Sequence, residues 1–229
     1  MGYILGLDLG SNSIGWACID PEKKQIIAMG SRVFKEGVNR DKKGGEISKN
    51  TTRRLARQSR TKYFRRADRK QKLKEVLQLA GMFPTSPAEV SEYLNCHKKY
   101  NPYSLRKKGL DEQLSKLELG RALYHLNQRR GFKSSRKSGD SKEAGVVAQE
   151  TAELQEKINA SKCRTLGEYF AQLDPSTTPI RGHYTLRKMY EHEFDLLWEK
   201  QSKFYPELND SLREDIKDKT IFSQRPLKS

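Results

Sequence analysis

The sequence predicts an α+β fold, with a β-meander at the N-terminus, one long arginine-rich helix and an all-helical remainder. Three observations support this. Short apolar runs separated by turn residues fill the first fifty positions, basic residues crowd positions 53–74, and apolar residues recur at helical spacing from position 115 onward. We therefore expect three parts, namely residues 1–50, 51–82 and 83–229.

Three apolar runs in the first part predict strands over residues 3–8, 13–19 and 26–34. Residues 21–24 begin with proline and supply the turn between the second and third runs. The first run is apolar almost throughout, which is typical of a central strand in a larger sheet. Because three strands alone leave apolar faces uncovered, we expect poor solubility or a covering partner.

Residues 51–82 predict one helix that carries positive charge on every side. Thr51 and Thr52 are suitable N-caps, and Gly81 is a suitable C-terminal stop. On a helical wheel the basic residues fall on opposite sides and between them, so no single apolar stripe can hold the whole helix. We expect it to bridge between two bodies and to follow successive phosphates.

The remainder of the chain predicts helices only. Ser115-Lys-Leu-Glu118 is a capping box, and it opens a helix that ends near Gly131. Lys133–Gly145 has the composition of a flexible linker, and Asp174–Gly182 that of a proline-rich connection. Further helices are expected over residues 146–160, 165–173, 185–204 and 208–218. The buried side of the 185–204 helix is expected to contain Met189, Phe194, Leu197 and Trp198.

The charge distribution favours a nucleic-acid-binding protein. Lysine and arginine number 45 against 29 aspartates and glutamates, a formal net charge of +16 in 229 residues. Positions 53–74 hold eleven basic residues against Asp68 alone, and seven of them are arginines, whose guanidinium forks suit phosphate. No apolar run is long enough to span a membrane, and three widely spaced cysteines encode no disulfide framework or zinc site. We expect a soluble, unsecreted chain in a reducing compartment.

Asp8 is the first candidate for a metal ligand, since it lies where the first strand runs into Gly10-Ser-Asn. A carboxylate at the end of a central strand is well placed to hold Mg²⁺, which takes oxygen ligands. On spacing alone, an aspartate that forms a turn with Gly10 is the favoured interpretation. The four histidines are scattered without a carboxylate-rich motif and are expected to be structural or exposed; they are His97, His125, His183 and His192.

Two families use a string close to this one. Gly6, Asp8 and Gly10 match the first phosphate loop of actin-like ATPases, but the second glycine-rich loop and the adenosine-binding segment of that family are not found in residues 53–229. The string Ile4–Ala17 (ILGLDLGSNSIGWA), followed by an arginine-rich helix, closely resembles the N-terminus of type II CRISPR RNA-guided DNA endonucleases, the Cas9 family. Further matches are residues 101–106, 119–137 and 221–228.

The resemblance implies a ribonuclease H-like (RuvC) segment in residues 1–50, an arginine-rich bridge helix in 51–82 and the start of a helical recognition lobe in 83–229. It implies that Asp8 is a catalytic Mg²⁺ ligand of the intact nuclease. Two-metal hydrolysis needs several carboxylates acting together, and the later RuvC segments and the HNH domain are absent, so this chain alone is expected not to cleave DNA. The expected RNA contacts are Arg53, Arg54, Arg57, Arg60, Arg65, Arg66, Arg69, Lys70, Arg129, Arg130, Lys133 and Arg136.

The implied partners are a guide RNA (crRNA with tracrRNA, or a single guide) and, in the intact enzyme, target DNA, in the cytoplasm of a prokaryote and without a membrane. One alternative is that the chain is the target of an acidic anti-CRISPR inhibitor protein, because carboxylates can replace phosphates on the same arginines. A less favoured alternative is an actin-like ATPase fragment, which tight Mg-ATP binding abolished by Asp8→Ala would support.

Overall fold

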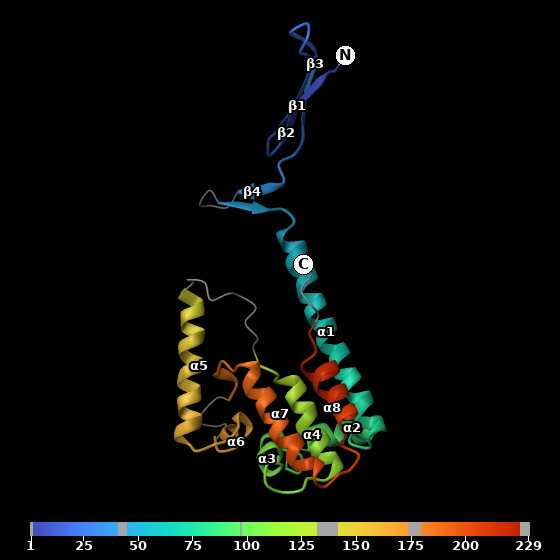
Figure 1. The fold of residues 1–229 in the computed structure, drawn as a ribbon, viewed down its shortest axis with the longest axis vertical. Coiled ribbons are helices and arrows are strands. Elements are labelled where there is room, and N and C mark those ends of the chain that lie inside the picture. The colour runs from blue at the N-terminus through green and yellow to red at the C-terminus, as the bar shows by residue number, and fades with distance from the viewer. Residues whose placement is uncertain (1, 41–44, 97, 132–141, 174–179, 225–229) are drawn as a thin grey trace. The chain divides into compact units, whose positions relative to one another are not determined.

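The computed structural model describes residues 2–40, 45–96, 98–131, 142–173 and 180–224, and it has the mixed helix and sheet content that the sequence predicts. The chain divides into two compact units, Met1–Phe64 and Arg65–Ser229. The long helix α1 runs through this division (Figure 1). This division does not test the three predicted parts, residues 1–50, 51–82 and 83–229, which are defined by function. They stay a proposal.

The first unit contains a three-stranded antiparallel sheet of β1 (Ile4–Leu9), β2 (Ser13–Asp20) and β3 (Gln25–Val33), in the order β1-β2-β3. The predicted meander is therefore confirmed, with bounds that shift by about one residue, as is usual for element ends. The register of β2 against β3 shifts between Cys18 and Ile19. Short connections and the antiparallel ladder follow from the turn residues that separate the three apolar runs.

A second hairpin follows the sheet, formed by β4 (Val38–Arg40) and β5 (Glu46–Ser48), and the sequence analysis did not anticipate it. Each strand has three residues, which is too short for a period-two pattern to be recognised.

The three-stranded sheet leaves large side chains exposed within this chain, as expected: Leu5 is 61% exposed, Leu7 59% and Ile26 61%.

Helix α1 spans Thr51–Leu79, close to the predicted helix. Its first backbone hydrogen bond runs from Arg54 N to Asn50 O (2.9 Å), so Asn50 occupies the N-cap position that the sequence analysis assigned to a threonine. The C-terminus confirms the predicted stop: Gly81 has φ +67°, and Met82 N donates to Leu77 O (2.7 Å). This is a Schellman motif, which requires a left-handed residue that glycine adopts without strain.

The second unit is helical (Figure 1). The capping box that opens α4 is present, with Ser115 N donating to Glu118 Oε2 (2.8 Å) and Glu118 N donating to Ser115 Oγ (3.3 Å). After α1 the helices are α2 (Pro87–Asn95), α3 (Pro102–Lys108), α4 (Lys116–Gln128), α5 (Lys142–Ala160), α6 (Leu166–Phe170), α7 (Arg187–Ser202) and α8 (Asp210–Ile216). A 3₁₀ turn covers Ile180–Gly182, and a π-helical turn, Lys217–Ile221, continues α8.

The core of this unit lies where α1, α4 and α7 supply fully buried apolar residues. Leu73 and Leu77 of α1 are completely buried, as are Leu123 of α4 and Leu197 of α7. Helix α3 packs against α4 and α6, and α7 packs against the same two helices. The predicted buried side of the 185–204 helix is confirmed for Phe194, Leu197 and Trp198, whereas Met189 is only partly buried against the core.

Several sequence-based bounds need correction. Helix α5 begins at Lys142, inside the predicted linker, and α6 ends at Phe170, three residues before the predicted end. Helices α2 and α3 were not predicted, because elements of nine and seven residues show too few periods of a helical pattern. The rest of the predicted linker up to residue 141, and positions 174–179, lie outside the described residues.

Two further expectations concern the chemistry of the whole chain. Cys18, Cys96 and Cys163 are free thiols, as the sequence analysis expected. In the part of the chain that the structure describes, none of the helices combines the length and apolar character needed to cross a bilayer.

Candidate nucleic-acid interface

All but one of the predicted RNA-binding arginines of α1 have exposed side chains. Within the described part of the chain, the ion pair on α1 joins Asp68 to Lys72 (3.1 Å), so no carboxylate there neutralises the arginines that precede it. Apolar side chains between these arginines are exposed as well: Leu55 is 55% exposed, Tyr63 67% and Phe64 72%. The exposed basic residues are Arg53, Arg54, Arg57, Arg60, Arg65, Arg66 and Lys70.

Arg69 differs from these residues because it is partly buried in the helical unit. Its backbone carbonyl accepts a hydrogen bond from Asn127 Nδ2 (3.4 Å) near the end of α4. Desolvation, followed by the charges of Arg66 and Arg187, lowers the pKa of Arg69. The Arg69 guanidinium is therefore partly desolvated and lies close to other positive charges of the helical unit.

The arginines at the exit of α4 have different surroundings. Arg129 caps the C-terminus of α4 and is half-buried. Arg130 Nη1 donates to two main-chain carbonyls, Ile221 O (3.0 Å) and Ser223 O (2.8 Å). Because both contacts are structural, only the remaining donors of Arg130 are available to a ligand. Lys133 and Arg136 lie outside the described residues.

Asp8 lies in β1 and is exposed. It pairs with Gly15 across the sheet, and a Cβ placed on Gly15 would stand 3.5 Å from Asp8 Cβ, which is ordinary van der Waals contact. Among the described residues, no group of three or more histidines, cysteines, aspartates or glutamates is placed to hold a metal ion. A single carboxylate does not fit Mg²⁺, which is bound by several oxygen ligands in near-octahedral geometry.

The histidines confirm their predicted structural roles where the structure describes them, and His97 lies outside the described residues. His125 is buried beside Arg106, and His192 is exposed. His183 stacks on Phe170 with ring centroids 5.8 Å apart. Among the described residues, none of the three belongs to a group of histidines, cysteines, aspartates or glutamates that could hold a metal ion.

A buried ionic cluster in the helical unit escaped the sequence analysis. Arg106 of α3 is fully buried and forms a two-pronged pair with Glu193 of α7, in which Nε contacts Oε1 and Nη2 donates to Oε2 (2.6 Å). Glu193 Oε2 also accepts from Gly167 N (2.8 Å), and Arg106 Nη1 donates to His125 Nδ1 (3.2 Å). Since the cluster is closed to solvent, it holds helices together and offers no ligand site.

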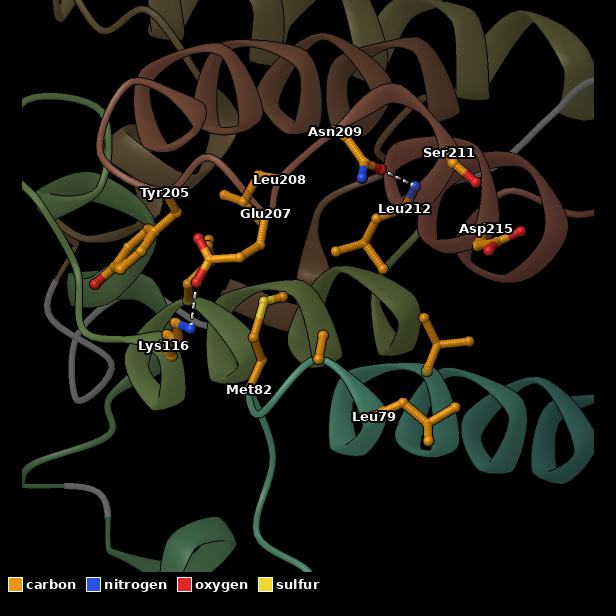
Figure 2. Close-up of a pocket in the computed structure, with 13 residues that line it drawn as sticks. Leu79, Met82, Lys116, Tyr205, Glu207, Leu208, Asn209, Ser211, Leu212 and Asp215 are labelled. Atoms are coloured by element: carbon orange, nitrogen blue, oxygen red, sulfur yellow. Dashed lines mark hydrogen bonds and ion pairs between the residues drawn. The ribbon is translucent and has the colours of Figure 1, made fainter.

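A groove of about 500 Å³ opens between α1, α4 and α8 (Figure 2). Its walls are mainly apolar and include Leu79, Met82 and Leu212, while Lys116 Nζ pairs with Glu207 Oε1 (2.6 Å) along the lining. Its charged groups are few and include carboxylates. The groove therefore lacks the convergent positive charge that a polyanion requires, in contrast to α1.

Comparisons with known proteins identify the family. No family model matches the chain. The Cas9 endonuclease of Campylobacter jejuni is 28% identical over the whole chain, and that of Staphylococcus aureus is 40% identical over 56% of the chain. The chain spans 24% of the length of the first relative and 11% of the second.

Solved structures have the same fold. The Campylobacter jejuni Cas9 complex with sgRNA and target DNA (AGAAACC PAM) matches the whole chain with a TM-score of 0.61 and 24% identity, over 30% of that chain. A St1Cas9-sgRNA-tDNA20-AcrIIA6 assembly matches 98% of the chain with a TM-score of 0.60 and 24% identity, over 26% of that chain. The chain belongs to the CRISPR-associated endonuclease Cas9 family, and it corresponds to an N-terminal portion of such a protein.

Proposed function

We propose that this chain is the guide-RNA-binding N-terminal portion of an RNA-guided DNA endonuclease. The observation that carries the proposal is the series of exposed, unneutralised arginines along α1 in a member of the Cas9 family. In this proposal residues 1–50 are a RuvC-like segment, 51–82 the bridge helix and 83–229 the start of the recognition lobe.

The chemistry of arginine supports a contact with the RNA backbone. A guanidinium presents its donors in a planar fork that matches two phosphate oxygens, and such contacts depend little on base identity. A-form RNA is recognised mainly by shape and backbone, so specificity for a target would come from base pairing by the guide. The backbone contacts proposed on α1 are Arg53, Arg54, Arg57, Arg60, Arg65, Arg66, Arg69 and Lys70.

The exit of α4 is a second proposed contact. We propose that Arg129 and the remaining donors of Arg130 also contact the RNA backbone. Lys133 and Arg136, which lie outside the described residues, are proposed from the sequence alone. Because Arg130 also holds the carbonyls of Ile221 and Ser223, its replacement would alter structure as well as binding. It is therefore a poor choice for a first mutation.

Asp8 is proposed as one Mg²⁺ ligand of the intact nuclease. Among the described residues, no cluster of acidic residues or histidines accompanies Asp8. In this proposal the other ligands therefore come from elsewhere in the intact nuclease. When several carboxylates hold Mg²⁺, the metal stabilises the attacking and leaving oxygens of phosphodiester hydrolysis. Because no second ligand accompanies Asp8 among the described residues, we propose that this portion binds RNA without cleaving DNA.

The proposal is tested by fluorescence anisotropy with a structured CRISPR guide RNA, a scrambled RNA of equal length and duplex DNA, each across a salt series. The guide RNA should bind most tightly, and its log affinity should fall linearly with log salt. Arg57→Ala should weaken guide binding several-fold and reduce the magnitude of the salt slope by about 0.7–0.9, since one phosphate contact is lost.

Arg213→Ala is the matched control. It also removes one arginine side chain, but Arg213 pairs with Asp195 (2.7 Å) on the helical unit, so guide binding should change little. Unchanged guide affinity and salt slope in Arg57→Ala would contradict the assignment of α1. Equal, weak binding to all three nucleic acids would contradict guide recognition by this chain.

An acidic inhibitor protein on the same arginines is the second candidate, because one structural relative is solved with AcrIIA6. A purified acidic inhibitor that competes with guide RNA, and loses affinity in Arg57→Ala, would support it. Membership of the Cas9 family argues against the actin-like ATPase alternative. Mg-ATP binding that is abolished by Asp8→Ala would revive that alternative.

A further inference from the structure

The groove between α1, α4 and α8 lies within the helical unit and has a buried apolar floor, to which Met82, Leu119 and Leu208 contribute. Its edge is different, because Leu79, the last residue of α1, is 91% exposed. Figure 2 shows Leu79 on α1 and Leu212 on α8 on opposite walls. A leucine left almost wholly in water beside an apolar groove gains stability when a partner covers both.

The segment that contains α8 carries an excess of negative charge. Both of its basic residues, Arg213 and Lys217, pair with Asp195 of α7, at 2.7 and 2.6 Å. Residues 207–218 hold five acidic side chains against these two cations, although the whole chain has a net charge of +16. The five are Glu207, Asp210, Glu214, Asp215 and Asp218.

The carboxylates that line the groove are only partly neutralised. Lys116 Nζ pairs with Glu207 Oε1 (2.6 Å). Lys219 Nζ pairs with Asp215 Oδ1 (2.8 Å) and also with Glu214 Oε1 (3.3 Å), so one ammonium group is shared by two carboxylates. The groove therefore presents apolar surface next to surplus negative charge, which is opposite in sign to the chain as a whole.

We propose that this groove is a docking site for a basic amphipathic helix of another protein. The helix places its apolar side chains on the groove floor and against Leu79, and its lysines or arginines beside Glu207 and Asp215. Helices bound in apolar grooves use anchors at positions i, i+3 or i+4 and i+7. The proposal goes beyond guide-RNA binding, because an acidic wall repels a polyanion.

The size of the groove and the charge of the chain make this site specific. Its volume of about 500 Å³ is that of a pocket for a compact ligand, which suits a few anchor side chains of a helix. The net charge of +16 repels a cationic peptide everywhere else on average. A basic helix that binds must therefore depend on the local apolar floor and acidic wall.

The test titrates the 229-residue chain into a fluorescein-labelled leucine–lysine peptide of about 18 residues, five helical turns, and follows fluorescence anisotropy. Its leucines lie on one helical face. This peptide should bind saturably, and more tightly than a peptide of the same composition whose leucines surround the helix. A third peptide, with glutamate in place of lysine, should bind more weakly despite the positive chain. Equal or tighter binding of either control peptide would overturn the proposal.

Leu79→Ser locates the apolar contact. It should weaken binding of the amphipathic peptide about tenfold to hundredfold, the effect of losing one leucine that becomes buried. Because Leu79 is exposed, its replacement should leave the fold intact. Tyr184→Ser is the matched control, since Tyr184 is 49% exposed on the same unit and does not line the groove. Equal affinities of the two variants would overturn the proposal.

Asp215→Asn locates the charge contact. It should weaken binding about two- to fivefold, as expected for an exposed ion pair. Glu199→Gln removes an exposed carboxylate of α7 outside the groove and should leave the affinity unchanged. Equal losses in the two variants would mean general electrostatics and would overturn the acidic wall as the recognition element.

Two other occupants are outcomes of further measurements. Sedimentation of the chain alone should show no self-association through the groove, and a dimer that Leu79→Ser abolishes would assign the groove to a second copy. In the intact nuclease, p-benzoylphenylalanine in place of Leu79 should crosslink to the added amphipathic peptide. A crosslink to a later segment of the same polypeptide would overturn the assignment to another protein.

This inference and the proposed function fail separately. Arg57→Ala should weaken guide-RNA binding without weakening peptide binding, because Arg57 does not line the groove. Leu79→Ser should weaken peptide binding and leave guide-RNA affinity unchanged. Loss of peptide binding in Arg57→Ala would overturn the groove as the binding site.

Discussion

Arg106 shows how one charged side chain can hold several helices together at the scale of single residues. It is fully buried, and its donors reach Glu193 of α7 and His125 of α4. Because arginine has donors only, His125 Nδ1 must be the acceptor of that hydrogen bond, and the imidazole is neutral with its proton on Nε2. Removing either member of the pair would leave an uncompensated charge in the core.

His125 makes the stability of the helical unit depend on pH. Desolvation, followed by the charges of Arg106, Arg121 and Arg129, holds the pKa of His125 well below its ordinary value of 6.5. The unfolded chain therefore binds a proton below pH 6.5 that the folded chain does not, and stability falls as pH falls. The loss should approach about 1.4 kcal/mol for each pH unit below the unfolded value.

Urea denaturation between pH 5 and pH 8 checks this prediction. His125→Gln should flatten the decline below about pH 6.5, because the titrating group is removed. His192→Gln provides the control, since His192 is exposed on α7 and should retain the full pH dependence. A decline of equal steepness in wild type and His125→Gln would contradict the prediction.

Gly120 is a second residue on which packing depends. It lies on α4, and a Cβ there would stand 1.8 Å from Met82 O, which is main chain and cannot turn aside. We expect Gly120→Ala to lower the free energy of unfolding by at least about 3 kcal/mol, at the upper end of overpacking effects. Urea denaturation measures this.

Gly182→Ala is the matched control, since no atom lies within 4 Å of a Cβ placed there. Its effect should stay within about 0.5 kcal/mol. If Gly120→Ala is as mild as Gly182→Ala, the close approach of α4 to the Met82 carbonyl would be contradicted.

At the scale of elements, α1 has a buried C-terminal part and an exposed, basic N-terminal part. Its last turns bury Leu73 and Leu77 in the helical core, while the turns before them expose arginines and apolar side chains alike. Arg53 and Arg57 are four residues apart, as are Lys62 and Arg66, so like charges adjoin on the helix surface. Each such pair destabilises a helix by about 0.2–0.5 kcal/mol.

The first half of α1 should therefore be stabilised by salt. Backbone amides of residues 53–64 are expected to exchange more slowly in about 0.5 M than in about 0.05 M sodium chloride, because the Debye length shortens and repulsion weakens. Hydrogen exchange followed by mass spectrometry measures this. Amides of α4, a capped and buried helix, provide the internal reference. Faster exchange of residues 53–64 in high salt would contradict the prediction.

At the scale of the whole molecule, the two units differ in how much apolar surface they bury. The helical unit has a continuous core, whereas the three-stranded sheet exposes Leu7 and Ile26 by 59% and 61%. Exposed apolar faces of this kind are typical of surfaces that another part of a protein covers. Stability measured for the chain should therefore report mainly on the helical unit.

The double variant Leu7→Ser, Ile26→Ser tests this difference. It should change the free energy of unfolding of the helical unit by less than about 0.5 kcal/mol, and it should reduce binding of a hydrophobic dye. Leu123→Ala is the contrasting core variant, which should cost about 2–5 kcal/mol because Leu123 is completely buried. A loss of helical stability in the sheet variant would contradict the prediction.

Local patterns predicted the fold wherever an element was long or carried a specific terminal signal. The Ser115–Glu118 capping box, the Gly81 stop and the three apolar runs of the meander each correspond to an observed feature. Short elements were missed, as in α3, and bounds next to the proline-rich connection were displaced. Their formation depends on contacts with distant residues more than on local preference.

The candidate interface was also predicted in part, because some of its features are local properties of the sequence. The density of arginine from Arg53 to Arg66 is a local property, and exposure of these residues follows from charge on all sides of the helix. The proximity of Arg187 to Arg69 was not anticipated, because nothing near Arg187 in the sequence sets it apart from a surface cation. Its proximity to Arg130 arises from the backbone contact at Gly131.

The sequence by itself determined the order of elements, the excess of positive charge on α1 and the resemblance to Cas9 endonucleases, because composition, periodicity and motifs are properties of neighbouring residues. Only the tertiary structure decided which charges are exposed, which are buried as in Arg106 with Glu193, and which lie near one another as Arg69, Arg130 and Arg187 do. Burial and convergence depend on segments that lie far apart along the chain and meet only when the helices pack.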